Sequence, residues 1–356
     1  MENKGLLFIP DISGFTRFVT ETEIGHSRLI IQELLEVLIR ANDTGLEISE
    51  IEGDAILFYK FGEPPALETL YKQVEKMFCD FHRNIIAYEH RRFCQCEACK
   101  SAIHLTLKVI THYGEFTGYN VQQFSKLIGK DVIVAHQLLK NDIDQHEYWL
   151  VTNSLLNDDQ KTELPAWMQW NTSAKQTESG EVPFQYTQLS RLKKEIAPDT
   201  LPKLQLSQKT KMVSFSKEYE AGIILLFHAT GDFNYRSRWR AGVKAIEEVM
   251  HFLPRVGMQC RCIMENGQVS IYSSSYSFHP ERIEFSETDV KDNSTVYYTL
   301  EKIAENKTKL TLDLYLEKNA ISQALFNLFK KKKTETNFRQ SLENLTSLAK
   351  EIKLPG

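Results

Sequence analysis

An apolar run that ends in an aspartate, near the amino terminus, constrains the fold of this chain more than any other feature. Leu6–Ile9 gives four consecutive apolar residues, Asp11 follows them, and Gly14 turns the chain. Short apolar runs bounded by turn residues are typical of buried strands. The run therefore predicts a strand that delivers a carboxylate to the edge of a sheet. A second acid, Asp54, lies in a Glu-Gly-Asp sequence between two strand-like segments, which predicts a tight hairpin.

The segments around these two acids predict a core of strands and helices. Apolar residues at three- and four-residue spacing predict helices, and alternating or continuous apolar stretches predict strands. With the first strand, the predicted order is β-α-β-β-α-β followed by a helix and a strand, an α+β fold with a ferredoxin-like core over residues 1–160. The predicted elements are helix 25–41, strands 46–52 and 55–61, helix 64–90, strand 103–113, helix 131–139 and strand 146–152.

The residues around the two acids also resemble a known family. The stretch Phe8–Thr16 is similar to the opening motif of class III adenylate/guanylate cyclase catalytic domains, and Glu50–Leu57 resembles their second motif, a Gly-Asp hairpin. The resemblance covers most of residues 5–155. It implies that Asp11 and Asp54 hold two divalent ions, Mg²⁺ or Mn²⁺, which clamp a nucleoside triphosphate while its 3′-oxygen attacks the α-phosphorus. It also implies a homodimer, because these enzymes usually build their sites at a dimer interface.

The chemistry of the two acids agrees with this role and leaves one alternative open. Hard cations such as Mg²⁺ take oxygen ligands, and one or two carboxylates with substrate phosphates form their usual protein site. Two such ions lower the pKa of an attacking hydroxyl and neutralise a leaving pyrophosphate. Phe15 and Thr16 would take part in substrate binding, because a turn that opens a helix presents N–H groups to phosphate oxygens. The alternative is that Asp11 caps the next segment and Asp54 only makes a turn.

The third region of the resemblance departs from the family at two positions. The family normally reads Gly-x-x-Val-Asn-x-Ala-x-Arg, whereas residues 129–137 read Gly-Lys-Asp-Val-Ile-Val-Ala-His-Gln. Ile133 therefore stands where the ribose-orienting Asn would be, and Gln137 stands where the transition-state Arg would be. A preorganised cation on the developing phosphoryl charge is an important source of catalysis. A neutral Gln cannot supply that charge.

Two further positions bear on the base of the nucleotide. Glu50 lies three residues before the hairpin glycine, where guanylate cyclases carry a Glu, and Lys126 lies three residues before Gly129, at the second base-reading position. Glu50 favours guanine, because a carboxylate accepts hydrogen bonds from the guanine N1–H and N2–H edge. The alternative is a solvated carboxylate on a strand.

These features predict a diverged nucleotidyl-cyclase-like protein with two functional alternatives. In the first, Asp11 and Asp54 bind metal and a nucleoside triphosphate and form a cyclic nucleotide, under the control of a second, ligand-binding domain. In the second, which Ile133 and Gln137 favour, the protein is a non-catalytic sensor or small-ligand-binding protein that keeps only the cyclase fold.

A cysteine-bearing segment lies between the helix at 64–90 and the strand at 103–113. Cys94, Cys96 and Cys99 follow one another at i, i+2 and i+5, with His90 before them and His104 after them. Three thiolates and one histidine are a ligand set of tetrahedral zinc. The alternative is reduced thiols without a metal, because the double Cys-x-x-Cys spacing of many zinc motifs is absent.

The second half of the chain predicts a separate ligand-binding domain. Residues 161–209 are polar and predict a linker with local packing, and residues 210–356 predict an antiparallel sheet with a long C-terminal helix. Over residues 210–352 this order resembles the START-related helix-grip fold of polyketide-cyclase-like (SRPBCC) domains, as does the Trp-Arg-Ala-Gly-Val sequence at Trp239. The resemblance implies a cavity for a small apolar or amphipathic ligand. The alternative is a cavity filled by the domain's own Phe, Tyr and Met side chains.

Charge and composition narrow the classes of function. The chain has 43 basic and 47 acidic residues, which gives none of the positive field that nucleic-acid partners demand. No apolar run approaches the roughly 20 residues of a membrane helix, and the amino terminus leads directly into a strand. Six cysteines without a secretory signal predict reduced thiols. We therefore expect a cytoplasmic protein without a membrane span, in which Lys330–Lys333 form a solvated helix face rather than a contact with an anionic membrane.

Overall fold

The computed structural model describes residues 3–92, 94, 96–156, 164–197, 204–249, 255–265 and 267–352. The chain divides into two compact units. The first comprises Met1–Ala87 and Ser101–Asp199, and the second comprises Tyr88–Lys100 and Thr200–Gly356. Within the described ranges, none of the helices has the length and apolar character needed to cross a membrane.

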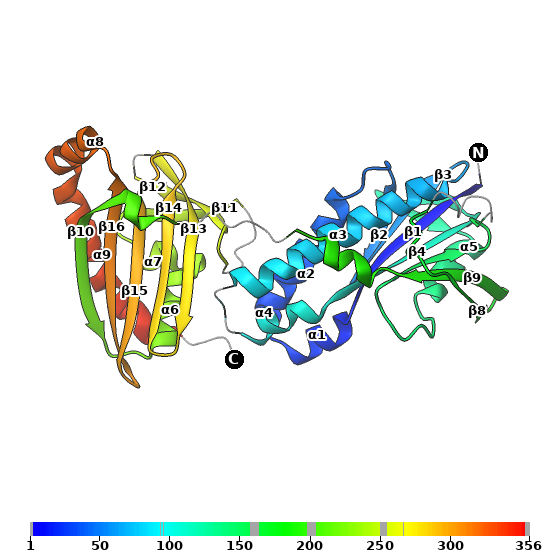
Figure 1. The fold of residues 1–356 in the computed structure, drawn as a ribbon, viewed down its shortest axis with the longest axis horizontal. Helices are drawn as coiled ribbons and strands as arrows, with labels where there is room; N and C mark the ends of the chain where they lie inside the picture. Colours follow the sequence, from blue (N-terminus) through cyan, green and yellow to red (C-terminus); the bar gives the residue numbers. More distant parts are fainter. Residues whose placement is uncertain are drawn as a thin grey trace. The chain divides into compact units, whose positions relative to one another are not determined.

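The first unit is built on a seven-stranded sheet with the strand order β2-β3-β1-β4-β7-β9-β8 (Figure 1). β4 and β7 are parallel, and the other neighbouring strands run antiparallel. The part β2-β3-β1-β4, with α2 and α3 as crossovers, has the ferredoxin-like order that the sequence predicts. The elements are β1 (Lys4–Ser13), α1 (Phe15–Glu21), α2 (Ile24–Arg40), β2 (Glu47–Glu52), β3 (Ala55–Phe61), α3 (Leu67–Arg91), β4 (Thr106–Glu115), β5 (Thr117–Val121), β6 (Phe124–Ile128), α5 (Lys130–Leu138), β7 (Tyr148–Thr152), β8 (Asn171–Thr177) and β9 (Gly180–Gln188).

β1 lies inside this core because both of its faces are apolar. Leu7 and Ile9 join a core cluster that includes α5, whereas Leu6 and Phe8 alternate to the opposite face. All four side chains are buried, which accounts for the continuous apolar run in the sequence. The side chain of Asp11 lies on the same face of β1 as those of Leu7 and Ile9. Its carboxylate therefore emerges on the side of the sheet that α5 covers.

Two hairpins of the first unit differ from the predicted elements. β5 pairs with β6 in a two-stranded ribbon, between the predicted strand at 103–113 and the predicted helix at 131–139, where the sequence predicts no strand. β8 pairs with β9, and β9 pairs with β7, so residues 171–188 extend the main sheet and do not form a linker over 161–209. The side chains of β8 are mostly exposed and polar, so this strand leaves no apolar period in the sequence. Residues 161–163 and 198–203 of the expected linker, and residues 157–160 before it, lie outside the described residues.

The second unit is a seven-stranded antiparallel sheet that packs against the C-terminal helices (Figure 1). Its strand order is β10-β16-β15-β14-β13-β12-β11, so the first strand pairs with the last. Leu312, Leu342 and Leu345 belong to the core between sheet and helix, as a helix-grip arrangement requires. The main elements are β10 (Lys209–Tyr219), α6 (Ile223–Gly231), α7 (Arg236–Trp239), β11 (Val243–Glu248), β12 (Gln259–Met264), β13 (Gly267–His279), β14 (Arg282–Asp289), β15 (Thr295–Ala304), β16 (Lys307–Glu317), α8 (Ala320–Leu325) and α9 (Lys331–Glu351).

The predicted C-terminal helix is interrupted between α8 and α9. A π-helical turn spans Phe326–Lys330, and both Phe326 and Phe338 are buried in the core. In a straight α-helix these two residues, twelve positions apart, would point about 120° away from each other. A π turn takes up about one extra residue and brings both rings to the same face.

The cysteine-bearing segment groups with the second unit, although the sequence places it within a first domain over residues 1–160. The segment is Tyr88–Lys100 and includes most of α4 (Glu97–Ser101). Arg92 forms an antiparallel bridge with Arg255, whose guanidinium lies 5.3 Å from the centre of the Tyr88 ring. These contacts join residues that are far apart in the chain, which is why the sequence does not indicate them.

Candidate functional site

Asp11 and Asp54 meet at one edge of the first unit's sheet. Asp11 lies near the end of β1, opposite Ala55 of β3 in the strand register. The hairpin that carries Asp54 turns back against β1, because the Ile12 N–H donates a hydrogen bond of 3.0 Å to the Asp54 carbonyl. The two aspartates therefore line the same cleft.

A lysine occupies the space beside Asp11. Lys108 of β4 lies opposite Asp11 in the strand register, and its Nζ is 3.3 Å from Asp11 Oδ1. The same ammonium donates a hydrogen bond of 3.1 Å to the carbonyl of Leu139, which follows α5. Both charged side chains are largely buried, so solvent ions screen this pair less than an exposed one. Lys108 thus places a positive charge between β1 and the end of α5.

Burial and neighbouring charges shift the pKa values of Asp11 and Asp54. Burial raises the pKa of Asp11 above its ordinary value, and the positive charge of Lys108 opposes that rise. Burial, followed by the negative charge of Asp11, raises the pKa of Asp54 to about 6. A raised pKa means that the charged form is disfavoured. Asp54 therefore takes up a proton as the pH falls through about 6, and the cleft then becomes more positive.

The cleft fits a pair of divalent ions poorly. The carboxylates of Asp11 and Asp54 are suitable ligands for Mg²⁺ or Mn²⁺. However, the Lys108 ammonium already lies within ion-pair distance of Asp11, and it would repel a divalent ion placed at the same carboxylate. A divalent ion at Oδ1 of Asp11 would have to displace the Lys108 ammonium. The two-ion centre that the cyclase resemblance implies therefore stays an expectation, which Lys108 opposes.

α5 lines another side of the cleft. Val132 and Ala135 pack into the core shared with β1 and β4, which gives a structural reason for the residue types at these two positions. Ile133 and Gln137, one helical turn apart, line the cleft instead. Neither of these two side chains brings a charge to the cleft. The basic side chains that line it, other than histidines, are Arg17, Lys108 and Lys140.

The cleft has a volume of about 850 Å³ and contains polar atoms that make no internal hydrogen bond. Ser13 is only 8% exposed, and neither its hydroxyl nor the buried Oε1 of Gln137 has a partner among the described residues. Buried polar groups are normally paired, so these atoms favour a polar ligand. Phe15 and Thr16 also line the cleft, and the ring of Phe15 lies over Gly53 of the hairpin.

The two predicted base-reading residues lie against each other. Lys126 of β6 forms an ion pair with Glu50 of β2, and His136 Nε2 lies 3.5 Å from Glu50 Oε1. Neither Glu50 nor Lys126 is among the described residues that line the cleft of Asp11. Glu50, Glu52 and His136 also bring their ligand atoms within 4.8 Å of one another, although Lys126 already compensates the charge of Glu50.

The three predicted thiol ligands of zinc come together. The Sγ atoms of Cys94, Cys96 and Cys99 all lie within 4.8 Å of one another. The side chain of His90 lies outside the described residues, and His104 is exposed on the short 3₁₀ helix Ala102–His104. The structure thus supports the thiol part of the predicted ligand set.

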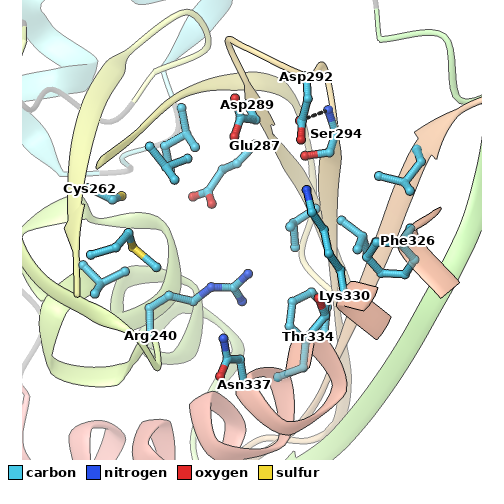
Figure 2. Close-up of a pocket in the computed structure, with 18 of the residues that line it drawn as sticks. Arg240, Cys262, Glu287, Asp289, Asp292, Ser294, Phe326, Lys330, Thr334 and Asn337 are labelled. Carbon is cyan, nitrogen blue, oxygen red and sulfur yellow. Dashed lines mark hydrogen bonds between the residues drawn. The ribbon is translucent and has the colours of Figure 1, made fainter. Parts of the chain in front are cut away.

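A second pocket, of about 860 Å³, lies inside the second unit between the sheet and the C-terminal helices (Figure 2). Leu314, Phe326 and Phe338 are among its apolar lining residues. Figure 2 shows the Arg240 guanidinium and the Glu287 carboxylate directed into the cavity. A cavity with apolar walls and a few convergent polar groups is typical of a small-molecule site. Of the apolar or amphipathic ligands that the sequence leaves open, the charged groups favour an amphipathic one.

Glu287 is held by a buried ion pair. Arg236 contacts both carboxylate oxygens of Glu287, with Nη1 at 2.6 Å from Oε2. The Tyr298 hydroxyl donates a hydrogen bond of 2.8 Å to the same oxygen. The guanidinium of Arg236 also lies over the rings of Phe233 and Trp239, at 5.0 and 5.3 Å. The charge of Glu287 is therefore compensated within the unit.

Arg240 lines the same pocket but forms no ion pair with a described residue. Its guanidinium lies 4.7 Å from the centre of the Phe338 ring and 5.8 Å from that of Trp239. Its Nη1 is buried and makes no hydrogen bond within the described part of the chain. A buried charged donor without an acceptor is costly, so this position favours an anionic group on a bound molecule.

Sequence reasoning missed Lys108, although the residue carries a signal. Lys108 stands between the apolar residues Leu107 and Val109 of a strand, and a lysine in such a strand is seldom buried unless it is paired. That signal indicates a partner without naming it. Only the register of β1 against β4 identifies the partner as Asp11.

The expected homodimer stays a prediction. β2 and β6 contact each other, and exposed apolar side chains gather on β2 and on the β5–β6 ribbon. Exposed apolar side chains on neighbouring strands favour a surface that another chain covers. The side chains are Ile48, Ile51, Tyr119, Val121, Phe124 and Ile128.

Comparisons with known sequences reach only part of the chain. A family model described as "Protein of unknown function (DUF2652)" matches residues 31–148. An uncharacterized protein of Mycobacterium tuberculosis is 29% identical over 130 residues, which is 34% of this chain. The matched region spans 56% of the length of that curated relative.

Solved structures with similar parts fall into two groups. An adenylyl cyclase of P. aeruginosa is 16% identical with a TM-score of 0.37, and the match covers 52% of this chain and 93% of the other. A guanylate cyclase domain of Catenaria anguillulae, solved with GTP, is 14% identical with a TM-score of 0.35, and covers 52% and 96%. A START superfamily protein of Mycobacterium smegmatis is 14% identical with a TM-score of 0.33, and covers 40% and 100%. Likenesses at this level support no conclusion about activity or ligands.

Proposed function

We propose that the first unit binds a nucleoside triphosphate in the cleft of Asp11 and Asp54 without cyclising it, and that Lys108 takes the place of a divalent ion there. The observation that carries this proposal is the ion pair between Lys108 and Asp11, inside a cleft that both cyclase-like motifs line. The proposal follows the non-catalytic alternative of the two that the sequence leaves open, and it adds retained nucleotide binding.

Three basic side chains of the cleft support binding of a polyanion, against the three acids Asp11, Glu52 and Asp54 that also line it. Lys108, Lys140 and Arg17 can attract phosphate oxygens, and a lysine is an established point-charge ligand for phosphate. The hydroxyl of Ser13 offers a donor that has no partner within the described protein. Protonation of Asp54 below about pH 6 removes one negative charge that would repel the phosphates. Because Lys108 already supplies a positive charge at Asp11, nucleotide binding is expected to be independent of added metal.

The same residues argue against catalysis. Cyclisation requires the 3′-hydroxyl to lose its proton and the pyrophosphate to leave with its negative charge stabilised. Ile133 and Gln137 line the cleft without supplying a cation, and Lys108 opposes a divalent ion at Asp11. A nucleotide would be held here without the groups that make its α-phosphorus reactive.

One observation favours the catalytic alternative. Asp11 and Asp54 are close enough for the charge of the first to raise the pKa of the second. Crowded carboxylates attract cations, so a divalent ion that displaced Lys108 would find two oxygen ligands. The experiment below distinguishes this alternative from the proposal.

The test measures binding and product formation on the same full-length protein. We expect calorimetry to detect saturable binding of ATP or GTP in EDTA, and mass spectrometry to detect no cyclic nucleotide with either nucleotide in Mn²⁺. Lys140→Met should weaken binding in EDTA, because it removes a cleft cation. Lys76→Met removes an exposed lysine that is paired with Asp80 on α3, and it should leave binding unchanged. Formation of cyclic product, or no binding in EDTA, would contradict the proposal.

We propose further that the pocket of the second unit binds a small amphipathic molecule whose anionic group faces Arg240. The buried, unpaired Nη1 of Arg240 supports an anion, and the apolar walls support a hydrocarbon portion. Charge-assisted hydrogen bonds contribute about 1.5–3 kcal/mol, so Arg240→Met should weaken binding about 10- to 100-fold.

A dansyl-labelled fatty acid and the matching alcohol are suitable probes for this pocket. In Arg240→Met, binding of the acid should fall and binding of the alcohol should stay the same, because only the acid uses the guanidinium. Arg261→Met, at an arginine that pairs with Glu247 and is not among the described lining residues, serves as the control. An equal loss of both probes would assign Arg240 a purely structural role and would overturn the proposal.

A further inference from the structure

The segment between α3 and β4 brings three thiols to one point. Cys94 and Cys96 are half-buried and lie just before α4, and Cys99 is 2% exposed within that helix. Their Sγ atoms lie within 4.8 Å of one another. Thiolates on one tetrahedral zinc ion, with Zn–S bonds of about 2.3 Å, lie about 3.8 Å apart. The three sulfur atoms therefore need little movement to share one ion.

The backbone around the thiols is arranged as it is around thiolate ligands. The N–H of Cys96 points at Cys94 Sγ with N···S at 3.4 Å, and the N–H of Cys99 points at Cys96 Sγ at 3.5 Å. Such N–H groups stabilise negative charge on sulfur and orient the ligand from outside the metal's own coordination shell. The turn before α4 thus directs N–H groups at two of the three sulfur atoms, as is usual around bound thiolates.

A disulfide and simple packing explain the cluster less well. No disulfide joins the described cysteines, and three cysteines cannot all pair with one another. Packed thiols occur elsewhere in this chain: Cys260 and Cys262 are buried on β12 with their sulfurs 4.0 Å apart and belong to an apolar cluster. Cys94 and Cys96, in contrast, are only half-buried. A site for a metal accounts for both their gathering and their partial exposure.

We propose that Cys94, Cys96 and Cys99 bind one structural zinc ion, which orders the segment between α3 and β4. Zinc is the soft, tetrahedral ion that three thiolates favour, and a histidine commonly completes the set. The proposal is independent of the nucleotide cleft and of the second-unit pocket. A scan in which each of the ten histidines of the chain is replaced by alanine would identify the fourth ligand.

The experiment measures the metal content of the full-length protein. Elemental analysis of protein purified without chelators should find about one zinc ion per chain. Cys99→Ser should lose most of this zinc, because it removes the buried ligand. Cys79→Ser changes a half-buried cysteine on α3 and should keep the full zinc content. Replacement of zinc by Co²⁺ should give the visible absorption of tetrahedral cobalt bound to thiolates.

A second measurement on the unaltered protein covers the case in which Cys99→Ser does not fold. Alkylation with iodoacetamide, mapped by mass spectrometry, should label Cys94 and Cys96 after EDTA treatment and leave them protected in zinc. The labelling of Cys79 should not depend on zinc. Zinc-free protein that binds no zinc after reduction, or equal labelling of Cys94 and Cys96 with and without zinc, would overturn the proposal.

Discussion

Replacing Glu287 by leucine is expected to destabilise the second unit by about 3–5 kcal/mol, because the change leaves a buried guanidinium without its counter-charge. The side chains of Arg236 and Glu287 are 2% and 5% exposed. Arg236 donates hydrogen bonds to both carboxylate oxygens of Glu287. It also donates to the Tyr298 hydroxyl and to the Thr230 carbonyl.

Urea denaturation of the full-length protein, followed by hydrogen exchange in peptides from β14 and β15, would measure this loss in the second unit. The variant Glu247→Leu breaks the exposed pair with Arg261, 3.0 Å apart, and should cost no more than about 1 kcal/mol.

The double variant Arg236→Met with Glu287→Leu tests whether the stability loss comes from the unpaired buried charge. It should recover most of the lost stability, since no buried charge remains, except for about 1 kcal/mol for the unpaired Tyr298 hydroxyl. If Glu287→Leu alone proved as stable as the natural protein, the description of this pair as a buried and mutually dependent ion pair would be wrong.

Replacing Lys108 by methionine is expected to convert the first unit's cleft from a polyanion site into a cation site. Methionine keeps most of the side-chain volume but removes the charge that lies 3.3 Å from Asp11. The buried carboxylate of Asp11 then lacks a counter-ion and adds to the negative charge beside Asp54. We expect Mn²⁺ affinity to rise and nucleotide affinity in EDTA to fall, each by about tenfold or more, since one pKa unit of interaction is about 1.4 kcal/mol.

Calorimetric titrations with Mn²⁺ alone and with ATP in EDTA would measure both changes. The variant Lys76→Met removes a lysine from an exposed pair with Asp80 and should alter neither affinity. Unchanged Mn²⁺ affinity in Lys108→Met would mean that Lys108 does not occupy the cation position at Asp11. Cyclic nucleotide formed by the variant but not by the natural protein would identify this lysine as the block to catalysis.

The local elements of the first unit could be predicted because their signals lie within short stretches of chain. The run Leu6–Ile9 is apolar at every position because both faces of β1 are covered. The Glu-Gly-Asp turn makes the expected hairpin between β2 and β3. Strands whose side chains stay in solvent carry no such signal, so β8 and the β5–β6 ribbon were not predicted.

For the candidate site as well, some features could be predicted from the sequence and others depend on the fold. The residue types at the motif positions, including Asp11, Asp54 and the uncharged pair Ile133 and Gln137, can be identified without a structure. The position of Lys108 opposite Asp11 requires the fold, because strand register depends on how β1 and β4 pair over many residues at once. In the second unit, the burial of Arg236 with Glu287 and the exposure of Arg240 to the pocket likewise depend on packing between distant segments. The sequence gives the charge of each side chain. Whether a charge is neutralised by another residue or can bind a ligand depends on distances between residues, which only the folded structure provides.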